Sequence, residues 1–335
     1  MSDHITRLMI LVTGGSGFIG SNLNAARAAE GKEVVIVDWL GQEGQKWRNL
    51  YHSPPARVVP PEALAAFLAS GPDISAVVHL GAISETTARD ADLVWQTNVT
   101  LSQTLWRWCA TYMVRFIYAS SAATYGDGRQ GFEDDMTLPA LRKLRPLNLY
   151  GWSKHSFDLW VAQELARGAP TPPNWAGVKF FNVFGPNEYH KGKMISVVKV
   201  KHDEVIAGGP ARLFKSDQPG LADGAQQRDF IYIDDVVAAL RFMLNVPKIT
   251  GLFNLGTGQA RSYADLARAV CAANNLPERI EFIDMPAPLK GQYQSFTQAP
   301  MARLRALGFN HRFMTLEDSV TAYIQTYLCQ PDPYR

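Results

Sequence analysis

A short apolar run leads directly into a turn built on three glycines, and this junction limits the possible folds more than any other feature of the chain. The run covers residues 8–13, the turn holds Gly14, Gly17 and Gly20, and a helical pattern follows over residues 20–30. Gly14 permits a tight turn, Gly17 lets the backbone approach a phosphate, and Gly20 lets helix and strand pack closely. The first N–H groups of the helix attract anions. The junction therefore predicts a dinucleotide site, with a purely structural turn as the alternative.

The first half of the chain alternates apolar runs with helical patterns. This alternation is typical of a parallel sheet buried on both faces. The expected strands cover residues 8–13, 33–38, 76–80, 115–120 and 176–181, and the expected helices cover residues 20–30, 63–70, 93–111 and 149–166. Right-handed crossovers make a doubly wound order the simplest topology. The predicted class is α/β, a Rossmann-type doubly wound parallel sheet.

The second half is richer in Gly, Pro, Lys and Asp and predicts a smaller α/β substrate lobe interleaved with the first domain. An apolar strand returns late in the chain, so the lobe is not expected to be one continuous segment. We expect residues 1–182 with 229–258 to form the dinucleotide-binding domain, and residues 183–228 with 259–335 to form the lobe. Within these segments the expected strands are 229–233 and 251–255, and the expected helices are 194–207 and 263–274.

Composition excludes several classes of protein. The 335 residues carry 33 Lys and Arg against 31 Asp and Glu, a formal net charge of +2, which indicates no basic surface for nucleic acid or membrane. Cys109, Cys271 and Cys329 are dispersed, which favours reduced thiols and argues against a zinc site. No apolar run approaches the ~20 residues of a membrane span, and we recognise no signal peptide. We expect a cytoplasmic protein with no metal.

Asp38 ends the expected second strand, where a carboxylate can accept hydrogen bonds from an adenosine ribose. This position ordinarily favours NAD over NADP. Lys46 and Arg48 follow closely and can neutralise a 2′-phosphate, unless they are solvated loop charges. The residues alone therefore leave the phosphorylation state of the cofactor open.

The third expected strand ends in His79-Leu80-Gly81-Ala82, at the same edge of the sheet as the glycine turn. Gly81 would let the backbone pass close to the cofactor, whereas His79 is interpreted as a packed residue at the strand end. Asn98, in the following helix, can satisfy buried backbone groups or serve as an ordinary helix residue.

Three side chains further along are candidates for proton transfer. The fourth strand runs into Ser120-Ser121, and Tyr150 and Lys154 are four residues apart, which places them on one face of a helix. A free phenol has a pKa of ~10 and is a poor base at neutral pH. A nearby ammonium group and a positive nicotinamide ring would lower that pKa. Ser121 would then hold the substrate oxygen while Tyr150 takes or returns its proton.

Across nearly its whole length the sequence resembles the extended short-chain dehydrogenase/reductase superfamily, most of whose members act on nucleotide sugars with NAD(P). The resemblance rests on the residues above and on the run Arg228-Asp229-Phe230-Ile231-Tyr232-Ile233-Asp234-Asp235-Val236. It implies that Lys154 also binds the nicotinamide ribose. It further implies a cofactor site that includes Gly14, Gly17, Phe18, Ile19, Gly20, Asp38, Gly81, Ala82, Asn98, Tyr150, Lys154 and Val183.

A narrower resemblance is to the ADP-glyceromanno-heptose 6-epimerase family of lipopolysaccharide precursor synthesis. Two elements carry it: the run from Phe181 to Gly192, which contains His190-Lys191-Gly192, and the run from Lys290 to Ala299. The resemblance implies inversion at C6″ of an ADP-linked heptose through a transient ketone. It makes Lys191 the second acid/base beside Tyr150, which agrees with the lowered pKa of a partly desolvated ammonium group.

The same resemblance implies that Asn182, Arg228 and Tyr293 hold the substrate along with Ser121 and Lys191. Arg228 suits the ADP pyrophosphate because guanidinium groups form paired, charge-assisted hydrogen bonds. Lys46 matches the family lysine expected near a 2′-phosphate, so NADP is preferred and NAD is the alternative. The family is homo-oligomeric, so we expect a homo-oligomer.

Other functions on the same fold remain as alternatives. A UDP-hexose 4-epimerase, or another NAD(P)-dependent nucleotide-sugar epimerase or reductase, shares Ser121, Tyr150 and Lys154 but has no need of Lys191. A nicotinamide-sensing regulatory protein is a remote alternative, because the complete Ser/Tyr/Lys set favours an enzyme.

Overall fold

A single seven-stranded parallel sheet forms the centre of the molecule. The computed structural model describes residues 9–41, 45–286 and 294–335. The strand order is β3-β2-β1-β4-β5-β6-β10, and every pair is parallel. The strands are β1 (Met9–Thr13), β2 (Val34–Val37), β3 (Arg57–Val59), β4 (Ile74–His79), β5 (Arg115–Ser121), β6 (Trp175–Phe180) and β10 (Thr250–Leu255). This is the doubly wound Rossmann order, which confirms the predicted fold class.

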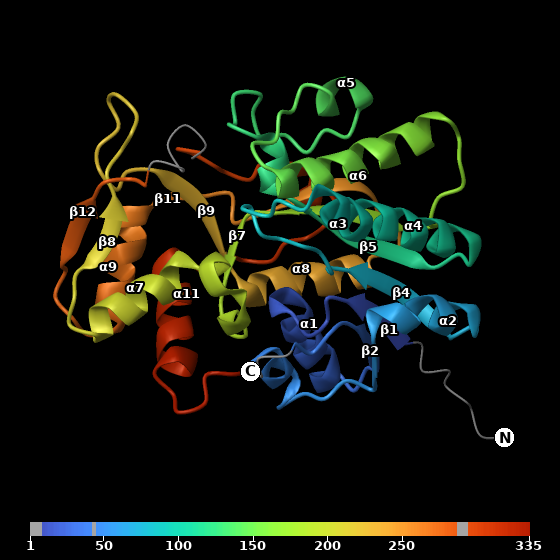
Figure 1. Cartoon of the computed structure of the whole chain (residues 1–335), viewed down its shortest axis with the longest axis horizontal. Coiled ribbons are helices and arrows are strands. Elements are labelled where there is room, and N and C mark those ends of the chain that lie inside the picture. Colours follow the sequence, from blue (N-terminus) through green and yellow to red (C-terminus); the bar gives the residue numbers. More distant parts are fainter. Residues whose placement is uncertain (1–8, 42–44, 287–293) are drawn as a thin grey trace.

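Helices cover both faces of this sheet, as Figure 1 shows. Neighbouring side chains on a strand point to opposite faces, and Leu11 and Val12 accordingly belong to two separate hydrophobic clusters. The first face packs α1 (Phe18–Ala29) and α8 (Ile233–Asn245), and the second packs α2 (Leu64–Ala69), α4 (Leu101–Thr111) and α6 (Leu149–Ala166). Because both faces are buried, the inner strands are mostly apolar instead of alternating, and Lys179 on β6 is an exception.

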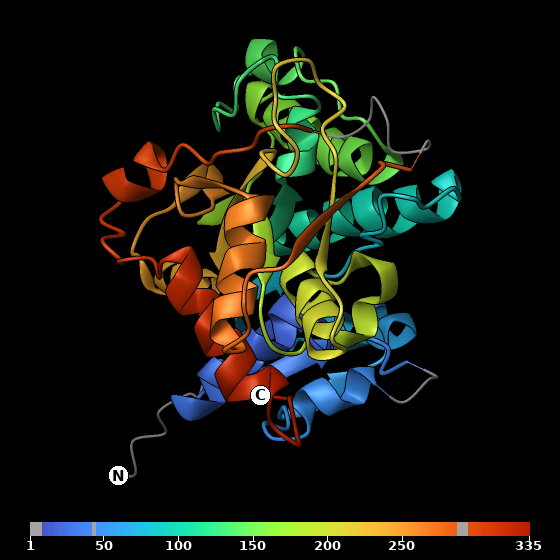
Figure 2. The ribbon, with the colours of Figure 1, turned by 90° about the vertical axis from the view of Figure 1, so that its left-hand side faces the viewer.

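The lobe lies beside one end of the large sheet and contains two small sheets (Figures 1 and 2). One has the order β11-β9-β7, and the other pairs β12 with β8. Their strands are β7 (Asn182–Phe184), β8 (Ala211–Phe214), β9 (Gln227–Tyr232), β11 (Ala260–Ser262) and β12 (Ile280–Ile283). The lobe's helices are α7 (Val197–Ile206), α9 (Tyr263–Ala273) and α11 (Leu316–Tyr323), with α9 packed against both of the others. Short helices α5 (Leu138–Leu141) and α10 (Ala302–Ala306) lie outside these layers.

Several elements differ from the sequence-based expectations. The helix expected over 93–111 is instead α3 (Ala91–Trp95), a π-helical turn (Gln96–Thr100) and then α4. Strand β9 joins the lobe's sheet, while β10 returns to the large sheet beside β6. The boundaries proposed for the two domains stay a prediction, because they depend on how these interleaved segments are divided. No helix among the described residues is long and apolar enough to span a membrane.

Candidate active site

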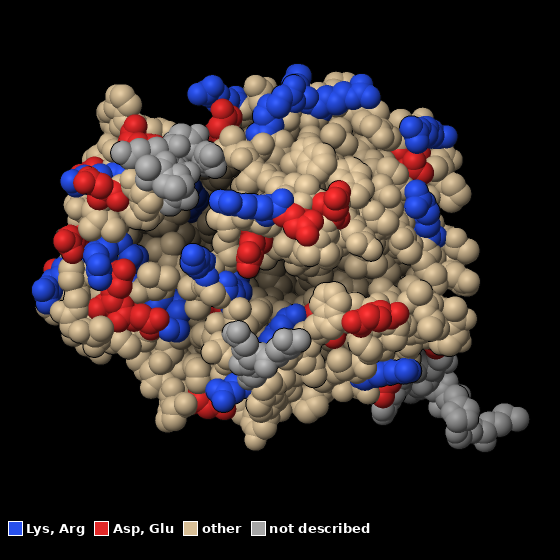
Figure 3. All heavy atoms as spheres, viewed as in Figure 1, with Lys and Arg blue, Asp and Glu red and all other residues tan. Residues whose placement is uncertain are grey.

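A cleft of about 1270 Å³ opens between the carboxyl ends of the parallel strands and the lobe. Ligands of doubly wound sheets bind where the strand order reverses, and here that point lies between β1 and β4. The space-filling view in Figure 3 shows this face hollowed between the two parts. The cleft is lined by the following residues proposed from the sequence: Gly14, Gly17, Phe18, Ile19, Gly20, Asp38, Lys46, Gly81, Ala82, Ser121, Tyr150, Lys154, Asn182, Val183, Lys191 and Arg228.

The glycine turn has the close backbone contacts that its spacing predicts. Gly14 has a φ of +66°, and a Cβ there would lie 2.6 Å from the backbone nitrogen of Gly81. A Cβ on Gly20 would lie 2.4 Å from the carbonyl oxygen of Gly14, so no larger residue fits. Helix α1 begins at Phe18 with no side chain capping its first N–H groups. The turn therefore presents the positive end of a helix to the cleft, where a pyrophosphate would bind.

Asp38 lies at the end of β2 and contacts both the glycine turn and Lys46. Its Oδ2 accepts hydrogen bonds from the backbone N–H (3.0 Å) and the hydroxyl (2.6 Å) of Ser16. Its Oδ1 lies 2.6 Å from Nζ of Lys46. Arg48 instead packs over the rings of Trp47 and Tyr334, at 6.0 and 5.9 Å. Of the two candidate cations near the ribose, only Lys46 lines the cleft.

The end of β4 is built around a buried histidine. The Nδ1 of His79 lies 2.6 Å from the hydroxyl of Thr13, and that hydroxyl accepts the N–H of Gly81 at 3.1 Å. Burial and the nearby ammonium of Lys154 lower the pKa of His79 to about 3. His79 is therefore a neutral, packed side chain that fixes Gly81, as the sequence interpretation holds.

Asn98 does not line the cleft but supports its wall. Its side-chain oxygen accepts the N–H of Ile83 and its Nδ2 donates to the carbonyl of the same residue, both at 2.9 Å. Its Nδ2 also donates to the hydroxyl of Ser153 at 3.0 Å. The residue lies in the π-helical turn, a feature common at functional sites. Asn98 therefore satisfies buried backbone, which is one of the two roles weighed from the sequence.

Ser121, Tyr150 and Lys154 come together from two elements that pack on each other. Ser121 ends β5, whereas the other two lie one turn apart on α6, which begins after its capping residue Asn148. Helix α6 comes close to the Ser121 turn because Gly151 leaves no room for a Cβ, which would lie 2.8 Å from the carbonyl oxygen of Ala123. The three side chains therefore reach the same part of the cleft.

Burial shifts the pKa values of both Tyr150 and Lys154. Burial raises the pKa of the Tyr150 phenol above its usual value, and a hydrogen bond with Ser121 offsets part of that increase. Burial also lowers the pKa of Lys154 to about 8. The expectation that an ammonium group and a nicotinamide ring together lower the Tyr150 pKa stays a prediction, because burial alone raises that pKa.

The lobe contributes Lys191 from a 3₁₀ segment, Tyr189–Met194. Its Nζ lies 5.0 Å from the ring centre of Phe18 at the start of α1, and 3.7 Å from the buried carboxylate of Glu188. Burial lowers the pKa of Lys191, while Glu188 counteracts the decrease. Lys191 thus faces the glycine turn across the cleft with a restrained, partly desolvated ammonium group.

Glu188 and His190 lie just before Lys191 in the chain, and the sequence analysis assigns them no role. Glu188 accepts hydrogen bonds from the N–H (2.8 Å) and hydroxyl (2.5 Å) of Ser196 and from the hydroxyl of Tyr323 (3.0 Å). His190 contacts the Nδ2 of Asn49 at 3.1 Å. Burial and the charges of Lys46 and Lys191 lower the pKa of His190 to about 4. Only their closeness to Lys191 in the sequence could have indicated that these two residues belong to the site.

The other proposed substrate residues lie on the lobe side of the cleft. Arg228 on β9 packs its guanidinium over the ring of Tyr263, 5.6 Å from its centre, and donates to the carbonyls of Gln227 and Gln294. Asn182 and Val183 begin β7. Tyr293 lies outside the described residues.

Basic side chains outnumber acidic ones in this cleft. The charged Lys, Arg, Asp and Glu residues that line it are Lys46, Arg89, Lys154, Lys191, Lys193 and Arg228 against Asp38 and Glu85. The small net charge of the whole chain thus conceals a local excess of positive charge, which suits phosphorylated ligands. The described residues contain no group of His, Cys, Asp and Glu that could hold a metal ion.

This fold and cleft define an α/β enzyme class that binds a dinucleotide beside a second ligand. The family described as "NAD dependent epimerase/dehydratase family" matches residues 10–256. The chain belongs to this family.

Curated relatives give a narrower placement. The "ADP-L-glycero-D-manno-heptose-6-epimerase" of Nitratidesulfovibrio vulgaris (strain Hildenborough) is 45% identical over 97% of this chain and 100% of the relative. The protein of the same name from Fusobacterium nucleatum is 42% identical over 97% and 100% of the two chains. The crystal structure of the Helicobacter pylori protein of that name is 26% identical, covers 97% of this chain and 98% of its own, and has a TM-score of 0.77. Within the family, the chain therefore groups with the ADP-heptose 6-epimerases.

Proposed function

We propose that the protein inverts C6″ of ADP-D-glycero-D-manno-heptose to the L-glycero configuration, in the synthesis of lipopolysaccharide precursors. The observation that carries the proposal is the placement of two proton-transfer groups in one cleft. Tyr150 reaches the cleft from the large sheet's side, and Lys191 reaches it from the lobe. Inversion needs proton handling on two faces of the sugar carbon, which one group alone does not provide.

The residues present fit a nicotinamide dinucleotide. The cradle formed by Gly14 and Gly20 excludes any Cβ, and the uncapped start of α1 faces it, as a pyrophosphate requires. Lys154 lines the same cleft, and we propose that it holds the nicotinamide ribose. When bound, the dinucleotide supplies reversible hydride transfer.

The chain's own residues handle the protons. Tyr150 takes the proton of the substrate hydroxyl while that carbon loses hydride, so the carbon becomes a ketone. The hydroxyl of Ser121 holds the same oxygen. When hydride returns to the opposite face, Lys191 gives a proton to the oxygen. Exchange with water then removes the proton from Tyr150 and restores that of Lys191, so the net reaction exchanges neither electrons nor protons. The raised pKa of Tyr150 means that it becomes a base only when positive charge is bound beside it.

We favour NADP over NAD. The ammonium of Lys46 lies 2.6 Å from the Asp38 carboxylate and balances its charge. A 2′-phosphate therefore meets less repulsion than a lone carboxylate would produce, and Lys46 is available to attract it. Arg228 is proposed to bind the ADP pyrophosphate of the substrate, with Asn182 and Tyr293 holding the sugar. A homo-oligomeric, cytoplasmic enzyme stays a prediction.

Two substrates test the proposal. The purified protein is incubated with ADP-D-glycero-D-manno-heptose or with UDP-glucose, and products are followed by NMR and chromatography. We expect inversion of the heptose at C6″ and no galactose from UDP-glucose. Inversion of UDP-glucose alone would overturn the proposal and support a UDP-hexose 4-epimerase. Release of nucleotide from denatured protein identifies the cofactor separately.

A further inference from the structure

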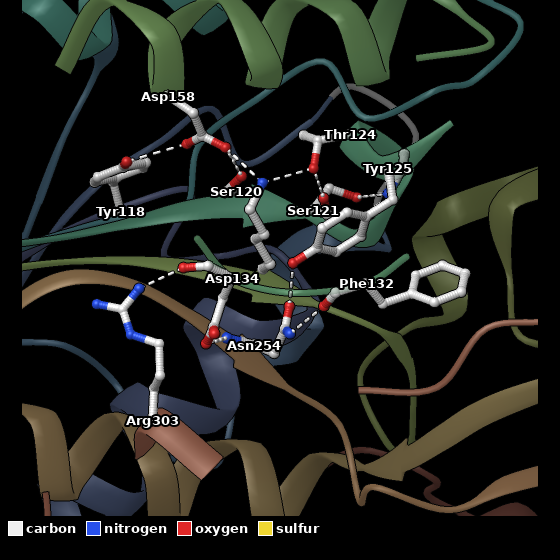
Figure 4. A network of polar contacts seen from close by, with 12 residues as sticks. Tyr118, Ser120, Ser121, Thr124, Tyr125, Phe132, Asp134, Asp158, Asn254 and Arg303 are labelled. Atoms are coloured by element: carbon white, nitrogen blue, oxygen red, sulfur yellow. Dashed lines mark hydrogen bonds and ion pairs between the residues drawn. The ribbon is translucent and has the colours of Figure 1, made fainter. Parts of the chain in front are cut away.

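A buried carboxylate lies directly behind the candidate active site. Asp158, on α6, accepts hydrogen bonds from the hydroxyls of Tyr118 (3.0 Å) and Ser120 (2.7 Å) and from the ammonium of Lys179 (2.8 Å). Figure 4 shows these contacts converging on one carboxylate between the helix and the sheet. Asp158 and Lys179 are both about 99% buried, so their charges are shielded from water. A buried pair of this kind requires well-formed hydrogen bonds to persist.

The same pair reaches the turn that carries Ser121. The ammonium of Lys179 donates to the hydroxyl of Thr124 at 2.6 Å, and this hydroxyl donates to the carbonyl oxygen of Ser121 at 2.7 Å. Lys179 also lies 4.9 Å from the ring centre of Tyr125. The path from Asp158 through Lys179 to Thr124 therefore connects α6 with the Ser121 turn. Figure 4 labels Asp158, Thr124 and Ser121 at its ends.

Asp158 lies on the same helix as Tyr150 and Lys154. Residues four apart lie on the same face of a helix, so Tyr150, Lys154 and Asp158 follow one another on one side of α6. Asp158 is also the charge that raises the pKa of Lys154 against the effect of burial. Other titratable groups also surround this position, among them His79 on β4, Tyr118 on β5, Tyr125 after β5, His155 on α6 and Lys179 on β6.

We propose that the Asp158–Lys179 pair holds Ser121 in register with Tyr150 and Lys154, and that Asp158 keeps the Lys154 side chain charged. Both are positioning residues, because the network places them behind the cleft and not on its surface. The proposal rests on the proposed function for its kinetic part only. One ion pair would thus control both the position of Ser121 and the charge of Lys154.

Asp158→Asn is the primary test because it keeps the size and shape of the side chain while it removes the charge and replaces one accepting oxygen with a donating amide group. In the cofactor-loaded enzyme we expect kcat to fall at least about 10-fold with KM within about 2-fold, because the reacting groups lose register. We also expect the alkaline limb of the kcat profile to move down by about one pH unit. A merely structural role would reduce the amount of folded enzyme and leave this limb unchanged.

A spectroscopic readout separates the inference from the proposed function. Lysine labelled with ¹³C at Cε reports the titration of Lys154 by NMR, with Lys154→Met used for assignment. We expect this titration to move to lower pH in Asp158→Asn whether or not the heptose is a substrate. If the wild type fails to invert the heptose while the titration still moves, the proposed function fails and the charge coupling stands.

Further variants cover the case in which a lone buried charge prevents folding. Asp158→Asn with Lys179→Met removes both charges, and we expect it to fold and to show the same lowered kcat and shifted limb. Lys179→Arg retains the positive charge, so we expect this variant to keep most of the wild-type kcat. Lys199→Met, which breaks an exposed pair with Asp203, is the matched control. Folded Asp158 variants with kcat within about 2-fold of wild type and an unmoved Lys154 titration would overturn the proposal.

Discussion

The two walls of the cleft are built in different ways. The wall that faces the dinucleotide comes from consecutive residues, since Gly14, Gly17 and Gly20 form one turn whose shape depends on their lack of a Cβ. On the opposite wall, Lys191 pairs with Glu188 three residues before it, and Glu188 is held in turn by Ser196 and by Tyr323 from far along the chain. Local backbone demands fix the first wall, and long-range hydrogen bonds fix the second. The two walls should therefore respond differently to substitution.

Loss of Lys191 should have the largest effect on activity. Lys191→Met removes the proposed second acid/base, and general acid–base groups contribute roughly 10²- to 10⁴-fold. We expect inversion of the heptose to slow by about 1,000-fold, while nucleotide content and thermal stability stay close to wild type. Steady-state kinetics and nucleotide release measure these quantities. Lys199→Met is the matched control, and full activity of Lys191→Met would instead favour the 4-epimerase alternative.

Disruption of the glycine turn should act through the cofactor. A Cβ at Gly20 would lie 2.4 Å from the carbonyl oxygen of Gly14, so Gly20→Ala must displace the turn. We expect dinucleotide affinity to fall at least about 100-fold, equivalent to about 3 kcal/mol, by calorimetry.

Gly31→Ala is the control for the glycine turn. Gly31 lies just beyond the same helix with a φ of +67°, and a Cβ added there would meet no atom within 4 Å. The substitution should cost about 1 kcal/mol of unfolding free energy from backbone strain and leave affinity unchanged. Equal nucleotide binding by Gly20→Ala and wild type would show that close packing of the turn is dispensable.

Removal of Lys46 should change cofactor preference by a smaller factor. Lys46→Met leaves the Asp38 carboxylate unbalanced, so we expect NADP to bind about 10-fold more weakly and NAD to bind about as before. Arg48→Met should alter neither affinity, because Arg48 contacts the rings of Trp47 and Tyr334. Competitive binding titrations give both constants. An equal loss for the two dinucleotides would contradict the role of Lys46.

Acid should reveal the smallest difference between the two walls. The folded-state pKa values of His79 and His190 are lowered from 6.5 to about 3 and about 4. Below pH 6.5 the unfolded chain binds more protons, so stability falls as the pH decreases towards these values, by at most about 1.4 kcal/mol per pH unit per group. Above pH 6.5 both histidines are neutral in the folded and the unfolded chain, so the unfolding free energy no longer depends on pH through them.

Variants of the two histidines separate these contributions. Urea unfolding between pH 4 and 7 should show a shallower pH slope in His79→Gln than in wild type. The slope of His190→Gln should change less, because that side chain is partly exposed and better screened. A slope unchanged in both variants would contradict their neutral, desolvated state.

The features predicted from the sequence are those that depend on neighbouring residues. Helix α6 has the expected limits, 149–166, and its capping residue Asn148 receives the N–H of Gly151. The order of the parallel strands follows from alternation and handedness. Lys46, Lys154, Lys191 and Arg228 all line one cleft. Lys154 is expected there from its spacing to Tyr150, whereas Lys191 and Arg228 are expected there from the family resemblance.

Features that depend on distant contacts could not be predicted. Strands β7 and β11 have three residues each, too few for a periodic signal, and both pair with β9. Asp158 and Lys179 are 21 residues apart on a helix and a strand, with no pattern that joins them. The raised pKa of Tyr150 results from burial, which spacing alone does not reveal.

The central claim is that one cleft inverts a carbon by removing hydride and returning it to the other face. Its most direct test is the reaction of ADP-D-glycero-D-manno-heptose in D₂O, with C6″ observed by NMR and mass spectrometry. Because the hydrogen on carbon leaves and returns as hydride, we predict the L-glycero product with no deuterium at C6″. Deuterium at C6″, or unchanged configuration with the cofactor bound, would contradict the account.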